Sequence, residues 1–273
     1  MKPASSIAKL PETAAEDGGA RSLAGAQTLV RGLDVLSAVA GGARNLPELA
    51  EVLGLTRSTI HRLATTLVEQ RFLNFTPRVG YSLGPKLLEL GHLAGRQMNL
   101  PRVAHDYLAH LSQETGDTVH LGILDGGQAL YLDKIQGSRR IEISSRIGER
   151  QPLRSTGIGK ALLLDENDAS LRDIYAREAA ERPGYGVNES IWLERMRHYR
   201  DAGYALDLEE NEDRIRCVAA PIRDASNRII GSISVSSAAQ YMDDARMKAL
   251  TGDVVGTAHA ISAEFGWSKR NQG

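Results

Sequence analysis

The stretch from Leu46 to Glu69 constrains the fold most strongly, because it predicts two short helices that meet at a tight turn. Gly54 follows the first helix at the point where a left-handed backbone favours a residue without a Cβ atom. Thr56 is a suitable N-cap for the second helix. The buried stripe of that helix recurs at three to four residue spacing and comprises Ile60, Leu63, Leu67 and Val68.

The opposite face of the second helix is polar and basic. It carries Arg57, Ser58, Thr59, His61 and Arg62. A short brace helix, a glycine turn and a basic exposed face are what a helix-turn-helix needs, because the start of its second helix enters the DNA major groove. The alternative is an ordinary helical hairpin whose charges are only solvated.

The flanking sequence favours the DNA-binding interpretation. Residues 27–40 predict a first helix of a three-helix core, with apolar residues at Leu29, Val30, Leu33, Val35, Leu36 and Val39. Residues 71–84 contain two short apolar runs around a Pro/Gly turn and predict a β-hairpin. A hairpin directly after a helix-turn-helix is a wing, and we expect Arg78 at its tip to meet the DNA backbone.

Further along the chain, strands and helices alternate irregularly. We expect helices at 85–98 and 101–114, a hairpin over 118–135, a strand at 140–147, a helix after Gly157 and two more near 169–177 and 190–202. Strands follow at 217–223 and 229–236, and a last helix at 243–265. Strands joined by hairpins, with helices between them, predict an α+β domain with a mainly antiparallel sheet. The helix at 85–98 is too apolar for a free linker, so we expect it to pack against a neighbouring domain or a second subunit.

The cysteine count, the lengths of the apolar runs and the distribution of charge indicate the compartment and the partner of the protein. The single cysteine, Cys217, excludes an internal disulfide and suits a reducing cytoplasm, and no apolar run approaches the roughly 20 residues of a membrane span. Residues 27–98 contain eight basic and five acidic residues, a net charge of +3 in a chain of net charge -1. Localised basic charge is what phosphate contacts require. We expect no metal site and no cofactor.

These motifs occur together in one order, and the sequence resembles the IclR family of bacterial transcription regulators over about residues 23–267. The resemblance rests on T-R-S-T-I-H-R-L, Y-S-L-G, R-S-T-G-I-G-K-A-L-L, G-Y-A-L-D and R-C-V-A-A-P-I-R-D. The first residues of the chain contain almost no large apolar side chains and predict a disordered tail at 1–22. The resemblance implies a winged helix-turn-helix domain at 23–84, which the linker helix at 85–99 joins to a GAF-like effector-binding domain at 100–269. It also implies a homodimer or a dimer of dimers, bound to double-stranded operator DNA.

The resemblance further implies a pocket for a small organic acid. Carried over by motif, the pocket residues are Gly157, Ile158, Asp207, Cys217, Ser234 and Ser236. The residues fit this role, because the N–H groups at the start of a helix suit a carboxylate, and Ser234 and Ser236 face the same side of a strand. We expect Asp207 to accept hydrogen bonds from ligand hydroxyls or to have a raised pKa, as a carboxyl group near like charge does.

The leading hypothesis is a ligand-responsive transcription factor, a repressor of a catabolic operon, which senses a sugar acid such as 2-keto-3-deoxygluconate. The first alternative is an activator that responds to an aromatic acid. A second alternative, from another class, is an enzyme acting on a small organic acid, although a lone cysteine with scattered histidines is weak evidence for one.

Overall fold

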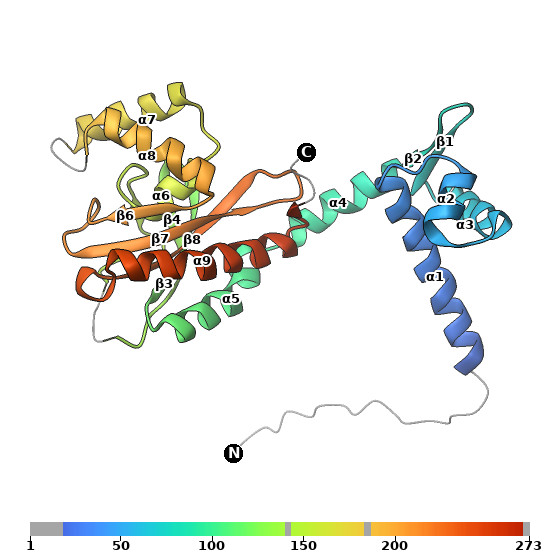
Figure 1. Ribbon diagram of the computed structural model, residues 1–273, viewed down its shortest axis with the longest axis horizontal. Coiled ribbons are helices and arrows are strands. Elements are labelled where there is room, and N and C mark those ends of the chain that lie inside the picture. Colours follow the sequence, from blue (N-terminus) through green and yellow to red (C-terminus); the bar gives the residue numbers. More distant parts are fainter. Residues whose placement is uncertain (1–18, 140–142, 183–186, 270–273) are drawn as a thin grey trace, which may run out of the picture. The chain divides into compact units, whose positions relative to one another are not determined.

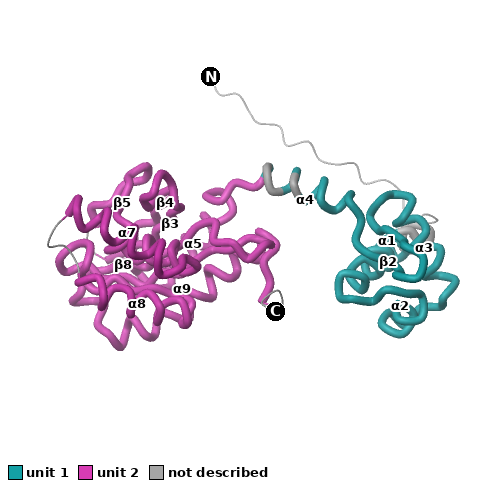
Figure 2. Tube along the Cα trace, turned by 90° about the horizontal axis from the view of Figure 1, so that it is seen from above, with its two compact units in different colours: residues 1–97 teal, residues 98–273 magenta. Residues whose placement is uncertain are grey.

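We describe a computed structural model of the chain, which covers residues 19–139, 143–182 and 187–269. The chain divides into two compact units, residues 1–97 and 98–273 (Figure 2). The predicted disordered tail lies largely outside the described residues. Helix α1 begins at Gly19, however, so the prediction of disorder for residues 19–22 is wrong. This segment contains Ala20 and Arg21, which are good helix formers and extend α1 toward the N-terminus.

The N-terminal unit is a three-helix core with a hairpin and a further helix (Figure 1). Its elements are α1 (Gly19–Ala40), α2 (Leu46–Leu53), α3 (Arg57–Glu69), β1 (Leu73–Thr76), β2 (Gly80–Leu83) and α4 (Pro85–Gln97). The side chain of Asn45 caps α2, and Gly54 ends it with a positive φ of 63°. The Thr56 side chain accepts a hydrogen bond from the Thr59 N–H and caps α3. The predicted helix-turn-helix and its wing are therefore present.

The core of this unit consists mainly of apolar residues that recur at helical spacing in the sequence. Val35, Leu49, Ile60, Leu63 and Leu73 are buried together. Three apolar residues that we expected in the same core, Leu29, Val30 and Leu33, are 66%, 54% and 53% exposed in the single chain. On α4, Leu88 and Leu93 are likewise exposed, so its packing against a partner stays a prediction.

The C-terminal unit is a six-stranded sheet with helices on both faces. Its elements are α5 (Leu100–Thr115), β3 (Thr118–Asp125), β4 (Gln128–Ile135), β5 (Arg150–Gln151), α6 (Gly157–Leu162), α7 (Asp168–Glu181), α8 (Glu189–Ala202), β6 (Ala205–Leu208), β7 (Ile215–Arg223), β8 (Ile229–Ala238), η1 (Ala239–Tyr241) and α9 (Asp244–Glu264). The strand order is β5-β4-β3-β8-β7-β6, and every neighbouring pair is antiparallel. The predicted α+β class with an antiparallel sheet is confirmed.

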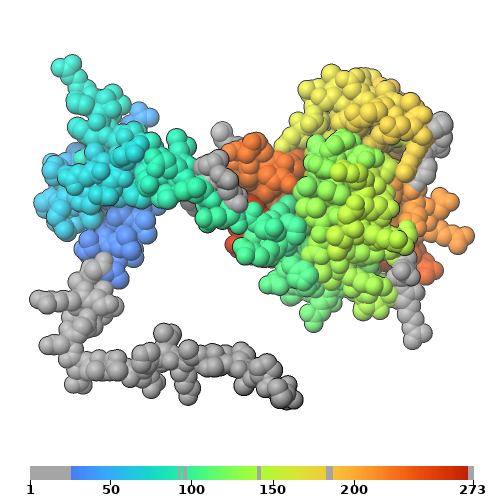
Figure 3. Space-filling model, turned by 180° about the vertical axis from the view of Figure 1, so that it is seen from behind, coloured from blue at the N-terminus to red at the C-terminus, as the bar shows by residue number. Residues whose placement is uncertain are grey.

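The helices form two separate layers. Helices α5 and α9 lie side by side under one face of the sheet (Figure 1) and share a core with Leu108, Val218 and Val254. The other face is covered by α6, with α7 and α8 beyond it, around the buried Trp192. In the space-filling view the yellow residues of α7 and α8 form one continuous mass beside the green hairpin β3–β4 (Figure 3). None of the described helices is long and apolar enough to cross a membrane.

One predicted strand is wrong. Residues 140–142 of the expected strand at 140–147 lie outside the described residues, and residues 143–147 form a loop. The Lys134 ammonium donates to the carbonyl oxygens of Ile143 and Ser145 at 2.6 and 2.7 Å. A side chain therefore satisfies the backbone acceptors that a neighbouring strand would satisfy in a sheet. The short strands β5 and β6 were not predicted.

Candidate functional site

The predicted DNA-contacting residues lie on α3 and at the tip of the wing. Arg57, Ser58, His61 and Arg62 are exposed, so their side chains are available to a duplex. Arg78 is also exposed and has a left-handed backbone with φ of 69°, at the turn between β1 and β2. Their contact with DNA stays a prediction.

Thr59 is placed differently from the other members of this set. It is half-buried, and its hydroxyl lies 2.9 Å from the Thr56 hydroxyl, while its N–H donates to the same oxygen at 3.3 Å. The Ser58 hydroxyl also lies 3.1 Å from the Thr56 hydroxyl. Thr59 thus belongs to the N-cap of α3, which orients the start of the helix.

The six predicted effector residues line one cavity of about 200 Å³ in the C-terminal unit. Gly157 and Ile158 come from the start of α6, Asp207 from β6, Cys217 from β7 and the two serines from β8. Their other neighbours around the cavity are His120, Tyr131, Ile143, Ser144, Ser145, Gln151, Thr156, Arg182, Asn211, Glu212 and Ile215. The structure brings together the six predicted residues, which are up to 79 positions apart, from Gly157 to Ser236.

Two glycines allow α6 to lie this close to the sheet and its own loop. A Cβ atom at Gly157 would come closer than 3.0 Å to the Cys217 sulfur, which real Cβ atoms essentially never do. A Cβ atom at Gly159 would lie 2.7 Å from the Pro152 carbonyl oxygen. The Thr156 hydroxyl accepts from the Gly159 N–H at 3.0 Å and caps the helix. The G-I-G turn is therefore required by packing, whatever it binds.

Asp207 is buried beside this turn, opposite Cys217 in the β6–β7 ladder. Its carboxylate accepts hydrogen bonds from the Glu210 N–H at 2.8 Å and the Asn211 N–H at 3.4 Å. Burial raises the pKa of Asp207 to about 7, and the charge of Lys160 opposes that rise. The predicted rise is present, but burial is its largest cause and like charge a minor one.

Lys160 was not among the predicted site residues, because a lysine side chain is usually exposed. It is 1% exposed, and its ammonium donates to the Leu206 carbonyl oxygen at 2.8 Å and pairs with Glu210. Glu210 also pairs with Arg195 of α8. Burial lowers the pKa of Lys160 to about 8. This ion-pair network holds the segment that carries Asp207.

The serines on β8 face the same side, as predicted. Their hydroxyls lie 3.5 Å apart, and the Ser236 hydroxyl lies 3.5 Å from His120 Nδ1. The other ring nitrogen of His120 lies 2.7 Å from the Ser145 hydroxyl. Burial, aided by the charge of Lys134, lowers the pKa of His120 to about 3, so the ring is neutral at physiological pH.

Tyr131 completes this wall, with its ring centroid 5.1 Å from that of His120. Neither His120 nor Tyr131 was singled out from the sequence. The cavity therefore offers hydroxyl and amide groups, two aromatic rings and two carboxylates to a small polar ligand. Across the described residues, no cluster of three or more His, Cys, Asp or Glu side chains could hold a metal ion.

Comparison with known proteins assigns both units. Residues 28–77 match the model of the IclR helix-turn-helix domain, and residues 92–263 match that of the C-terminal region of the bacterial transcriptional regulator IclR. The chain is 33% identical to the transcriptional regulator XynR of Escherichia coli over 88% of its length and 98% of that protein. It is 32% identical to KdgR of the same organism, over 81% of this chain and 86% of KdgR.

A solved structure agrees with these sequence matches. The crystal structure of the Agobacterium tumefaciens repressor BlcR is similar with a TM-score of 0.75 and 25% identity, and the match covers 89% of this chain and 98% of that one. XynR and KdgR are transcriptional regulators by name, and BlcR is a repressor.

Proposed function

Because the chain belongs to the IclR family of DNA-binding transcriptional regulators, we propose that it represses a catabolic operon and that a small organic acid in the cavity changes its affinity for the operator. Two observations support the proposal: the exposed basic face of α3, and the cavity lined by the six predicted effector residues. A ligand shifts such an equilibrium only if it binds one arrangement of the protein better than the other.

On the DNA side, we propose that Arg57, His61 and Arg62 reach base edges and phosphates in the major groove, with Arg78 on the backbone. In a homodimer, two copies of α3 would meet a near-palindromic operator about 34 Å apart. Exposed apolar residues on α1 and α4, such as Leu33 and Leu88, support burial in an assembly of more than one chain.

We propose a sugar acid such as 2-keto-3-deoxygluconate as the effector. The observation that carries this choice is the hydroxyl-rich lining, which includes Ser144, Ser145, Ser234 and Ser236. Such groups pair with the hydroxyls of a sugar acid, whereas the rings of His120 and Tyr131 favour the aromatic-acid alternative. The identities to XynR and KdgR are nearly equal, so identity does not select a branch of the family.

The enzyme alternative finds no support in the cavity. Burial raises the pKa of the Cys217 thiol to about 12, so the sulfur is not a thiolate at neutral pH. The neighbouring ring of His120 is hydrogen-bonded to serine hydroxyls and not to the sulfur.

Isothermal titration calorimetry with the full chain at pH 6.5 tests the effector class. Because burial raises the pKa of Asp207, this mildly acidic pH favours its uncharged form and weakens its repulsion of an acid. We expect heat of binding from 2-keto-3-deoxygluconate and none from protocatechuate or 4-hydroxybenzoate. Heat from an aromatic acid alone would overturn the sugar-acid assignment and favour the alternative.

A further inference from the structure

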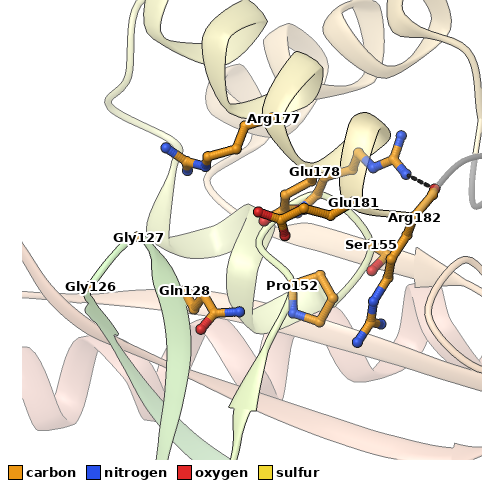
Figure 4. A pocket seen from close by; sticks show the side chains of 10 residues that line it. Gly126, Gly127, Gln128, Pro152, Ser155, Arg177, Glu178, Glu181 and Arg182 are labelled. Carbon is orange, nitrogen blue, oxygen red and sulfur yellow. Dashed lines mark hydrogen bonds between the residues drawn. The ribbon is translucent and has the colours of Figure 1, made fainter.

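Arg182 follows α7 directly and lines two cavities at once. One is the effector cavity, and the other is a neighbouring cavity of about 350 Å³ bounded by the β3–β4 turn, Pro152, Ser155 and the end of α7. Figure 4 shows the second cavity, with the Arg182 side chain running past Ser155 and Arg177 pointing away toward the Gly126–Gly127 turn. Arg182 therefore lies on the wall that the two cavities share.

The backbone of Arg182 is held in place while its side chain is left free. Its N–H donates to the Glu178 carbonyl oxygen at 2.9 Å as the C-cap of α7. Its carbonyl oxygen accepts from the Arg154 guanidinium at 3.2 Å, and that guanidinium lies 4.9 Å from the centre of the Tyr175 ring. Within the described part of the chain, no hydrogen bond or ion pair engages the guanidinium of Arg182 itself.

Other arginines of this unit are engaged by carboxylates. Arg197 on α8 pairs with Asp168, and the guanidinium of Arg223 makes two hydrogen bonds of 2.7 Å to Asp165. Arg195 pairs with Glu210 behind the cavity. Arg182 instead leaves its guanidinium exposed beside the polar cavity that it lines, with no carboxylate partner among the described residues.

The charge of the effector cavity shows what such a guanidinium can do. Two carboxylic acids, Asp207 and Glu212, line the cavity, and the His120 ring is neutral. Arg182 contributes the one cationic side chain among the described residues that line it. An acid that enters a cavity containing carboxylates needs a compensating cation, and a planar guanidinium can bind a carboxylate through two parallel hydrogen bonds.

We propose that Arg182 determines the specificity of the cavity for acids, by binding the carboxylate of the effector. This inference rests on the proposed function and adds to it the orientation of the ligand. It places the carboxylate at the Arg182 side of the cavity, in place of the N–H groups at the start of α6 that we expected from the sequence, and the hydroxyl-bearing part faces Asp207, Ser234 and Ser236.

The test is calorimetry on the full chain with 2-keto-3-deoxygluconate and, separately, protocatechuate. For whichever acid binds the wild type, Arg182→Gln is expected to lower the affinity about tenfold or more, because hydrogen bonds between charged groups are lost. Arg182→Lys keeps the charge and should recover part of the loss. Arg177→Gln is the matched control, since Arg177 lies in the last turns of α7, five residues before Arg182, and of these two cavities lines only the neighbouring one.

A second readout separates charge pairing from a structural effect. The affinity of the wild type should fall as salt rises from low to physiological concentration, and that dependence should be weaker in Arg182→Gln. If the wild type and Arg182→Gln bind the acid equally, the assignment of Arg182 is wrong while the proposed function stands. If neither acid binds the wild type, the proposed function fails and this inference fails with it.

Discussion

Replacing Arg57 and Arg62 together by alanine should lower the affinity for operator DNA by about a hundredfold or more. Both side chains are exposed on α3, and a well-placed arginine contact to a base contributes about 1–3 kcal/mol. In a homodimer the double substitution removes two arginines from each of two recognition helices. The measurement is a gel-shift titration with the promoter fragment beside its own gene, at fixed salt concentration, because phosphate contacts make the affinity strongly salt-dependent.

Arg102→Ala provides the matched control for this experiment. Arg102 is exposed on α5 in the C-terminal unit, so the substitution removes one positive charge without touching α3. It should leave the affinity nearly unchanged. Undiminished operator binding by the Arg57→Ala, Arg62→Ala protein would remove α3 from its assigned role.

Gly157→Ala should abolish the response to the acid and lower the free energy of unfolding by about 1–3 kcal/mol, the usual cost of overpacking a core. The new methyl group would overlap the Cys217 sulfur and lie 3.3 Å from Ala219 Cβ. The start of α6 must then move away from β7, which deforms the cavity at Ile158 and Asp207. Calorimetry measures the binding, and urea unfolding measures the stability.

Two further variants identify the cause of that effect. Gly252→Ala on α9 meets nothing within 4 Å, so it should be neutral or slightly stabilising, since alanine is the better helix former. Adding Cys217→Ala to Gly157→Ala removes the overlapping sulfur and should restore part of the stability. A double variant as unstable as Gly157→Ala alone would show that contact with the sulfur is not the reason.

The N-terminal unit was largely predictable because its determinants are local. Thr56 and Gly54 mark helix ends whose side-chain and backbone requirements extend over a few residues, and Ile60 and Leu63 repeat with the helical period. The exposure of Leu29 and Leu33 was not predictable, because the same period is found wherever a helix has an apolar face, whether the chain itself covers that face or not.

The strands of the sheet were predictable only where a turn between two apolar runs indicated a hairpin. Strand β6 has only four residues and lies at the edge of the sheet, next to β7. Such a short strand, not joined to its neighbour by a tight turn, leaves little pattern in the sequence. The sequence of residues 140–147 alternates apolar and polar residues at its start, as a strand does, yet residues 143–147 form a loop that the side chain of Lys134, 9 and 11 residues earlier, contacts at Ile143 and Ser145. Alternation alone could not exclude a loop there.

The candidate site shows the same division. Its six predicted residues come from motifs, and the family resemblance placed them in one pocket. The sequence did not indicate His120, Lys160 or Arg182, because an isolated polar residue in a sequence is usually exposed to solvent. The burial of Lys160 depends on its ion pair with Glu210. The position of Arg182 depends on the hydrogen bond that its carbonyl oxygen accepts from Arg154. These partners are recognisable only once the chain has folded.

The central claim is that an acid in the C-terminal cavity alters how the N-terminal unit binds DNA. The most direct test is the affinity of the wild-type protein for its promoter fragment, with and without saturating amounts of the acid that releases heat in calorimetry. We predict a change of about fivefold or more, which is the usual range of coupling between two sites. Equal affinity in both conditions, with the acid shown to be bound, would contradict the account.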